Sequence, residues 1–247
     1  MENNFFVRDF NWSFSKLNCF DTCKYAFYLQ YIEENKGIDN SFGQFGTHCH
    51  KILEKYANNE LEIFELLPEY EMTYWETVTE KFPPNKYKDL GESYFNQGLE
   101  YFENFEGFDE YEILGVEEEV KFKIGEFNFT GFIDLVLRKD GIIINDHKSK
   151  SKLSKKEKEK YLKQLYLYSI PIKEEYGEYP IELWFNMIRF NEIIKEQFQM
   201  NKLEETKQWA LDSINTILNE KEWKPTNSDY FCRFICGVRE LCDKREY

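Results

Sequence analysis

The sequence predicts an α/β protein, in which helices are combined with a β-sheet. Through roughly the first hundred residues apolar side chains recur at helical spacing, whereas Val, Ile and Phe are concentrated over 111–147. A Lys- and Glu-rich helical pattern, two further β-rich runs and a last helical pattern follow. This order indicates a sheet core with a helical lobe.

The N-terminal lobe has apolar residues at every third or fourth position. Its first stripe is interrupted near Asp21-Thr22, which would cap a second short helix. The predicted helices of the lobe cover 13–34, as two short pieces, and then about 42–56, 60–79 and 86–105.

The sheet core is predicted from runs rich in β-branched and aromatic residues, separated by turn residues such as Gly125-Glu126 and Asp140-Gly141. The predicted strands are 111–124, 127–138, 141–147, 181–189 and 192–200, with helices near 154–174 and 202–220. We expect a single domain over 1–247, made of a helical lobe (1–110), a sheet core (111–200) and a helix with a cysteine-bearing tail (201–247).

The chain is acidic, with a net charge of −14, which argues against a protein that neutralises DNA phosphates over a wide surface. The charge is reversed locally, since 147–163 holds eight lysines and two glutamates. No apolar run approaches the ~20 residues of a membrane span, and no secretory leader is evident. We therefore expect a cytoplasmic protein without membrane contact, encoded by a bacterium, an archaeon or a phage.

Two aspartates stand in predicted strands that are otherwise mostly apolar. Asp134 is the one charge within 131–137, and Asp146 and Lys148 end the run 141–148. Strand side chains alternate, so Asp146 and Lys148 share a face with the isoleucines before them. Burying such a charge is costly unless it is paired or binds a metal. If the strands are neighbours, both carboxylates reach one Mg²⁺ or Mn²⁺; the alternative is a structural Asp–Lys pair.

Three residues in predicted helices are ambiguous by themselves. His50 lies beside the apolar face of the third helix, where a histidine is usually structural, and His48 points to another side. Gln164 and Tyr168 stand one helical turn apart on the later helix. In isolation, the edge of an amphipathic helix explains that pair.

Three of the six cysteines, Cys232, Cys236 and Cys242, fall within eleven residues near the end of the sequence. Cys23 could supply a fourth thiolate, and Cys19 stands one helical turn before it. In a reducing compartment such cysteines are metal ligands or buried thiols rather than disulfides. Four thiolates suit a tetrahedral zinc or an iron–sulfur cluster, and their spacing does not separate the two.

Taken in order, these motifs resemble the PD-(D/E)XK nuclease superfamily. A G-x-x-D strand containing Asp134, a turn, and a strand ending in D-x-K at Asp146 and Lys148 are similar to its signature, with Ile133 in place of the proline. The resemblance implies a restriction-endonuclease-like fold, with a mixed sheet core flanked by helices. It also implies that the two aspartates ligate the metal and act with Lys148 in catalysis.

Two further motifs resemble the RecB-like branch of this superfamily. The pattern G-x-x-x-H-x-x-L-E places His50 at the position of an additional metal ligand of that branch. Gln164 and Tyr168 match its Q-x-x-x-Y motif, which implies that they contact DNA.

The cysteines are similar to those that hold a 4Fe-4S cluster in the same branch, one early and three near the C-terminus. The resemblance assigns Cys23, Cys232, Cys236 and Cys242 to the cluster, which would act as a structural clasp. The usual tail is C-x2-C-x5-C, whereas this chain has C-x3-C-x5-C. Zinc therefore stays an alternative.

We therefore expect a DNA nuclease that uses Mg²⁺ or Mn²⁺ and acts as an exonuclease on single-stranded ends. The resemblance extends to CRISPR-associated exonucleases and to nuclease domains of helicase–nuclease recombination complexes. It implies a role in recombination, repair or CRISPR adaptation, with a protein partner in that pathway. The alternative is a catalytically silent DNA-binding or protein-interaction relative, which the net charge of −14 keeps open.

Overall fold

The computed structural model describes residues 10–150, 152–226 and 228–244. These residues form two compact units. The sheet unit comprises Asn40–Val120 and Phe132–Gln199, and the cysteine unit comprises the described parts of Met1–Asp39, Lys121–Gly131 and Met200–Tyr247. The single domain expected over 1–247 stays a prediction.

A five-stranded mixed sheet confirms the predicted α/β class. Its strands lie in the order β1 (Glu112–Ile124), β2 (Phe127–Arg138), β3 (Ile142–Lys148), β4 (Glu182–Met187) and β5 (Glu192–Gln197). β3 pairs antiparallel with β2 and parallel with β4, and β4 pairs antiparallel with β5. The parallel step requires a crossover, which α7 (Lys155–Tyr176) provides.

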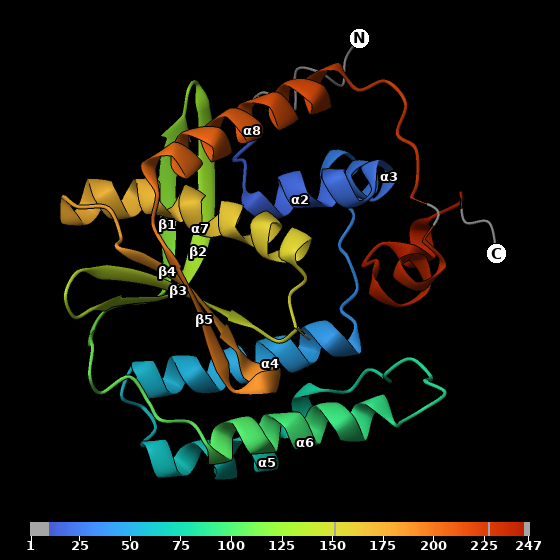
Figure 1. Ribbon diagram of the computed structural model, residues 1–247. Coiled ribbons are helices and arrows are strands. Elements are labelled where there is room, and N and C mark those ends of the chain that lie inside the picture. The colour runs from blue at the N-terminus through green and yellow to red at the C-terminus, as the bar shows by residue number, and fades with distance from the viewer. Residues whose placement is uncertain (1–9, 151, 227, 245–247) are drawn as a thin grey trace. The chain divides into compact units, whose positions relative to one another are not determined.

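Helices cover both faces of the sheet in the sheet unit. α4 (Ser41–Ala57), α5 (Leu66–Thr77) and α6 (Leu90–Glu103) form a layer on one side of β3 and β4, and α7 lies on the other side (Figure 1). Leu135, Leu137 and Ile143 pack with Ala57 on the α4 side. With both faces covered, β3 is buried from Ile142 through His147, as a central strand with a parallel neighbour should be.

The cysteine unit contains α2 (Phe14–Thr22), α3 (Lys24–Phe27), a π-helix (Tyr28–Ile32) and α8 (Met200–Asn219). The N–H of Trp12 donates to Asn128 O at the β1–β2 hairpin, and its C=O accepts from Thr130 N, both at 2.8 Å. The cap predicted at Asp21-Thr22 is wrong by one residue. Cys23 caps α3, because its Sγ accepts from the N–H of Ala26 at 3.4 Å.

The helices predicted over 60–79 and 86–105 are shorter in the structure, and residues 78–89 between α5 and α6 form an irregular loop. Pro83 and Pro84 lack the N–H that a helix needs. Asp89 then caps α6, since its Oδ1 accepts from the N–H of Glu92 at 3.1 Å. In the described part of the chain, none of the helices has the length and apolar character that crossing a membrane requires.

Gly98 is needed where α6 crosses α5, and replacing it with Ala should destabilise the fold. A Cβ at position 98 would lie 2.1 Å from Tyr70 Oη, and the Tyr70 ring is fully buried. We expect Gly98→Ala to lower the free energy of unfolding by about 1–3 kcal/mol in urea denaturation, through overpacking. The control is Gly91→Ala in the half-buried first turn of α6, where the nearest atom to an added Cβ is Asp89 Oδ1 at 3.2 Å, so that the cost should be much smaller. Equal stability of Gly98→Ala and the wild type would contradict this packing.

Candidate functional site

Asp134 and Asp146 extend the antiparallel ladder between β2 and β3. The ladder pairs Val136 with Ile144 and Leu135 with Asn145, so the next residue of each strand is one of the two aspartates. Burial and the neighbouring Asp146 raise the pKa of Asp134 to about 7. Two buried carboxylates that face each other are unfavourable unless a cation lies between or beside them.

Lys148 supplies one such cation. Its Nζ lies 2.6 Å from Asp146 Oδ2, and both side chains are largely buried. Burial lowers the pKa of Lys148, but the carboxylates of Asp146 and Asp134 raise it by more than burial lowers it. The pKa of Lys148 is therefore above its ordinary value. The ammonium both pairs with and donates a hydrogen bond to Asp146, so it offsets one of the two facing carboxylates.

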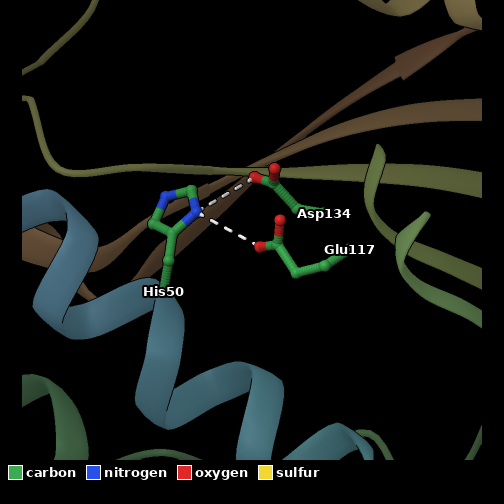
Figure 2. Close-up of side chains that lie close together, drawn as sticks. All are labelled: His50, Glu117 and Asp134. Carbon is green, nitrogen blue, oxygen red and sulfur yellow. Dashed lines mark ion pairs between the residues drawn. The ribbon is translucent and has the colours of Figure 1, made fainter. Parts of the chain in front are cut away.

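His50 approaches the carboxylates from α4. Its Nε2 donates to the backbone carbonyl of His147 at 3.0 Å, because a carbonyl oxygen only accepts. Its Nδ1 therefore carries the lone pair, 3.7 Å from Asp134 Oδ2 and 3.6 Å from Glu117 Oε1 (Figure 2). Burial lowers the pKa of His50, but Glu117 and the two aspartates raise it overall. A ring nitrogen that faces two carboxylates is oriented as a metal ligand would be.

Glu117 joins this group although the sequence analysis did not select it. Its backbone has φ = 45°, a left-handed conformation that is rare for a residue other than Gly. The left-handed residue interrupts the alternation of β1 and leaves the carboxylate beside His50 and Asp134 (Figure 2). Residues held in this conformation are concentrated at functional sites.

Together, His50, Glu117 and Asp134 offer one nitrogen and two oxygen ligands that all lie within 4.8 Å of one another. Asp146 stands across the ladder from Asp134 and adds a further carboxylate. Carboxylate oxygens suit Mg²⁺ and Mn²⁺, and one imidazole among them is accepted more readily by Mn²⁺. The residues present therefore fit a divalent cation.

Gln164 and Tyr168 reach the same site from α7. Lys148 Nζ donates to Gln164 Oε1 at 3.3 Å, and Gln164 Nε2 donates to Tyr168 Oη at 3.2 Å. The Lys148 ammonium also lies over the Tyr161 ring, 4.8 Å from its centroid. The α7 side chains therefore orient Lys148, and burial raises the pKa of Tyr168 to about 12, which keeps its hydroxyl neutral.

Gly46, about one helical turn before His50, is required for a steric reason. A Cβ at Gly46 would lie 2.9 Å from Ser149 Oγ, just after Lys148, so the absence of a side chain lets α4 approach the end of β3. His48 lies elsewhere, buried between Tyr70 and Tyr74, with Nε2 3.3 Å from Tyr70 O. Of the two histidines, His50 alone therefore stands by the carboxylates.

A second cluster lies in the cysteine unit, where one small cavity is lined by Cys23, Cys232, Cys236 and Cys242. Cys23 Sγ accepts from the N–H of Thr226 at 3.3 Å as well as from Ala26. Four thiols around one cavity suit either a tetrahedral zinc or an iron–sulfur cluster.

Comparison with known proteins agrees with this geometry. A family model described as the PD-(D/E)XK nuclease superfamily matches residues 11–243. The fold is similar to the crystal structure of a candidate exonuclease from Eubacterium rectale, with a TM-score of 0.56 and 11% identity over 100% of this chain and 92% of that one. The structure of SSO0001 aligns with a TM-score of 0.38 and 15% identity over 81% of this chain and 96% of that one. No curated protein matches the sequence.

Glu117→Gln should weaken the binding of Mn²⁺, because the variant removes one negative ligand beside His50 and Asp134. We expect the dissociation constant to rise by about tenfold or more, as measured by isothermal titration calorimetry. The matched control is Glu119→Gln, which makes the same charge change at an exposed position of β1. Equal Mn²⁺ affinity in the two variants would remove Glu117 from the ligand set.

Proposed function

Because the chain belongs to the PD-(D/E)XK nuclease superfamily and has its restriction-endonuclease-like fold, we propose that it is a metal-dependent deoxyribonuclease. The observation that carries the proposal is the opposed pair Asp134 and Asp146 with the Lys148 ammonium 2.6 Å from Asp146. Hydrolysis of a phosphodiester needs charge stabilisation at the phosphate and an oriented water. Buried carboxylates, a nearby ammonium and an imidazole match that requirement.

The roles divide between the metal ligands and Lys148. Asp134 and Asp146 would hold the cation with His50 and Glu117, and bound Mg²⁺ or Mn²⁺ would polarise the phosphate and lower the pKa of water. Lys148 would stabilise the negative charge that develops at the phosphate, in a position held by Gln164. Tyr168 would contact the DNA backbone at the same edge of α7.

The substrate that we propose is DNA with free or single-stranded ends, cut by an exonuclease. The resemblance to the RecB-like branch supports this choice, and the fold likeness to a candidate exonuclease is consistent with it. The same resemblance supports a place in recombination, repair or CRISPR adaptation beside a protein partner, and a cytoplasmic location.

We also propose that Cys23, Cys232, Cys236 and Cys242 hold a 4Fe-4S cluster. The four cysteines line one cavity although the first is separated from the others by most of the chain, and the resemblance to the RecB-like branch supports an iron–sulfur cluster over zinc. Bonds to all four would join α2 and α3 to the C-terminal tail of the same unit, so that binding the cluster contributes to folding.

Asp146→Asn and Lys148→Met should abolish nuclease activity. With end-labelled single- and double-stranded DNA and Mn²⁺, we expect rates at least about 100-fold below the wild type, because each variant removes a charge that stabilises the reaction. Lys150→Met is the matched control, since it removes an exposed ammonium that lies over the same Tyr161 ring as Lys148 but pairs with Glu157 and not with Asp146.

Three outcomes of this assay matter. Wild-type and Lys150→Met protein should degrade linear single strands and leave covalently closed circles intact, as an exonuclease does. Cleavage of circles would make the enzyme an endonuclease. Equal degradation by all variants, or none by the wild type, would reject the nuclease and leave a catalytically silent DNA-binding relative.

Protein purified without oxygen should contain about four iron and four sulfide per chain and show broad visible absorbance. Cys23→Ser should lose the iron and much of the soluble yield, because the cluster holds the cysteine unit together. The control is Cys19→Ser, one helical turn away and outside the cavity lining, which should keep both. Stoichiometric zinc in place of iron would reject the cluster.

A further inference from the structure

The loop 78–89 is fixed to the helix that carries His50. Gln44 on α4 accepts from the backbone N–H groups of Thr79 and Glu80 at 3.0 and 2.8 Å, and its Nε2 lies 3.3 Å from Thr79 Oγ1. Gln44 and His50 are six residues apart on α4, about 9 Å along the helix axis. The start of the loop is therefore held to the same helix as His50, less than two turns before it, within the sheet unit.

The loop 78–89 carries three lysines against Glu80 and Asp89, a local net charge of +1 in a chain that is strongly acidic. The stretch 81–88 reads KFPPNKYK, and its lysines Lys81, Lys86 and Lys88 are all exposed, with no carboxylate between them. The next acidic residue, Asp89, turns toward the start of α6, where it caps the helix. A short cationic segment in a protein of net charge −14 is suited to a local anionic partner.

Two exposed aromatic rings accompany the lysines. A cavity of about 800 Å³ is lined by Trp75, which is 64% exposed, and by most of the loop, including Lys81 and Lys88 but not Lys86 or Tyr87. The Trp75 ring packs against Phe95 and Tyr74, at centroid distances of 5.3 and 4.9 Å, so its position is supported from within the helical layer. Tyr87, on the loop itself, is 93% exposed.

We propose that this surface, made of Trp75, Tyr87 and the three loop lysines, binds a single strand of nucleic acid that leads to the metal site. Lysines beside exposed rings are how proteins hold single strands, because phosphates pair with the ammonium groups and any base can stack on a ring. A duplex hides its base faces and cannot use the rings. That the strand leads toward His50 rests on the proposed function. That this surface binds a single strand does not.

The test is the binding of a fluorescent 20-nucleotide oligo(dT) to the full chain without added divalent metal, measured by anisotropy. Trp75→Ala and Tyr87→Ala should each raise the dissociation constant by roughly tenfold, as the loss of one stacked base does. The matched control is Phe64→Ala, which removes a ring that is 75% exposed but lies before the start of α5, at the other end of that helix from Trp75 and the loop, and should bind as the wild type does.

The lysines and the rings are separated by two further measurements. Lys81→Gln with Lys88→Gln should reduce the slope of log K against log salt by about 0.7 per lysine. An abasic oligonucleotide of the same length should bind the wild type roughly tenfold more weakly than oligo(dT), and Trp75→Ala should remove much of that difference.

The proposal is overturned if Trp75→Ala binds as the wild type does, if Phe64→Ala loses as much affinity, or if abasic and normal strands bind equally. Displacement of oligo(dT) by an equal concentration of poly-glutamate would instead assign the surface to an acidic protein partner, and would also reject it. No cleavage occurs in these assays. A chain that never cuts DNA can therefore still show tryptophan-dependent binding, and an active nuclease can fail to show it.

Discussion

The candidate site depends on the burial of two carboxylates on adjacent strands. Asp134 and Asp146 oppose each other because the β2–β3 register pairs Val136 with Ile144, and that register is fixed by apolar side chains on both faces. A slip of one residue would turn a strand's entire apolar set toward the wrong face. The energy gained by burying those side chains therefore holds the two negative charges together, at a cost that nearby cations offset.

His147, between Asp146 and Lys148, links the parts of the site through its backbone. The N–H of His147 donates to Asp134 Oδ2 at 2.6 Å, and its carbonyl accepts from His50, so one backbone unit orients both. Its ring lies on the other face of β3, where Asn186 donates to Nδ1 at 2.9 Å. Burial lowers the pKa of His147 well below its ordinary value, so this ring stays neutral.

Sequence rules predicted the parts of this site that depend on local pattern. Strand alternation and a short turn placed Asp134 opposite Asp146, and helical spacing set Gln164 beside Tyr168. Glu117 was not predictable, because Glu117, Glu118 and Glu119 look alike in the sequence and only the left-handed backbone of the first turns it toward His50. The loop 78–89 was predicted too short, as 80–85, since the apolar spacing on both sides of its prolines continues the helical pattern.

The net charge of −14 is a weak guide to whether nucleic acid can approach this protein. At 0.1 M salt, charges more than about 10 Å apart hardly interact, so the local balance decides. In the lysine-rich stretch 147–163, Lys150 pairs with Glu157 and Lys158 with Glu196, which reduces its positive charge below the count of lysines. If the protein binds DNA as proposed, a few short-range contacts would hold the strand, and the remaining negative surface would repel DNA that is not engaged at them.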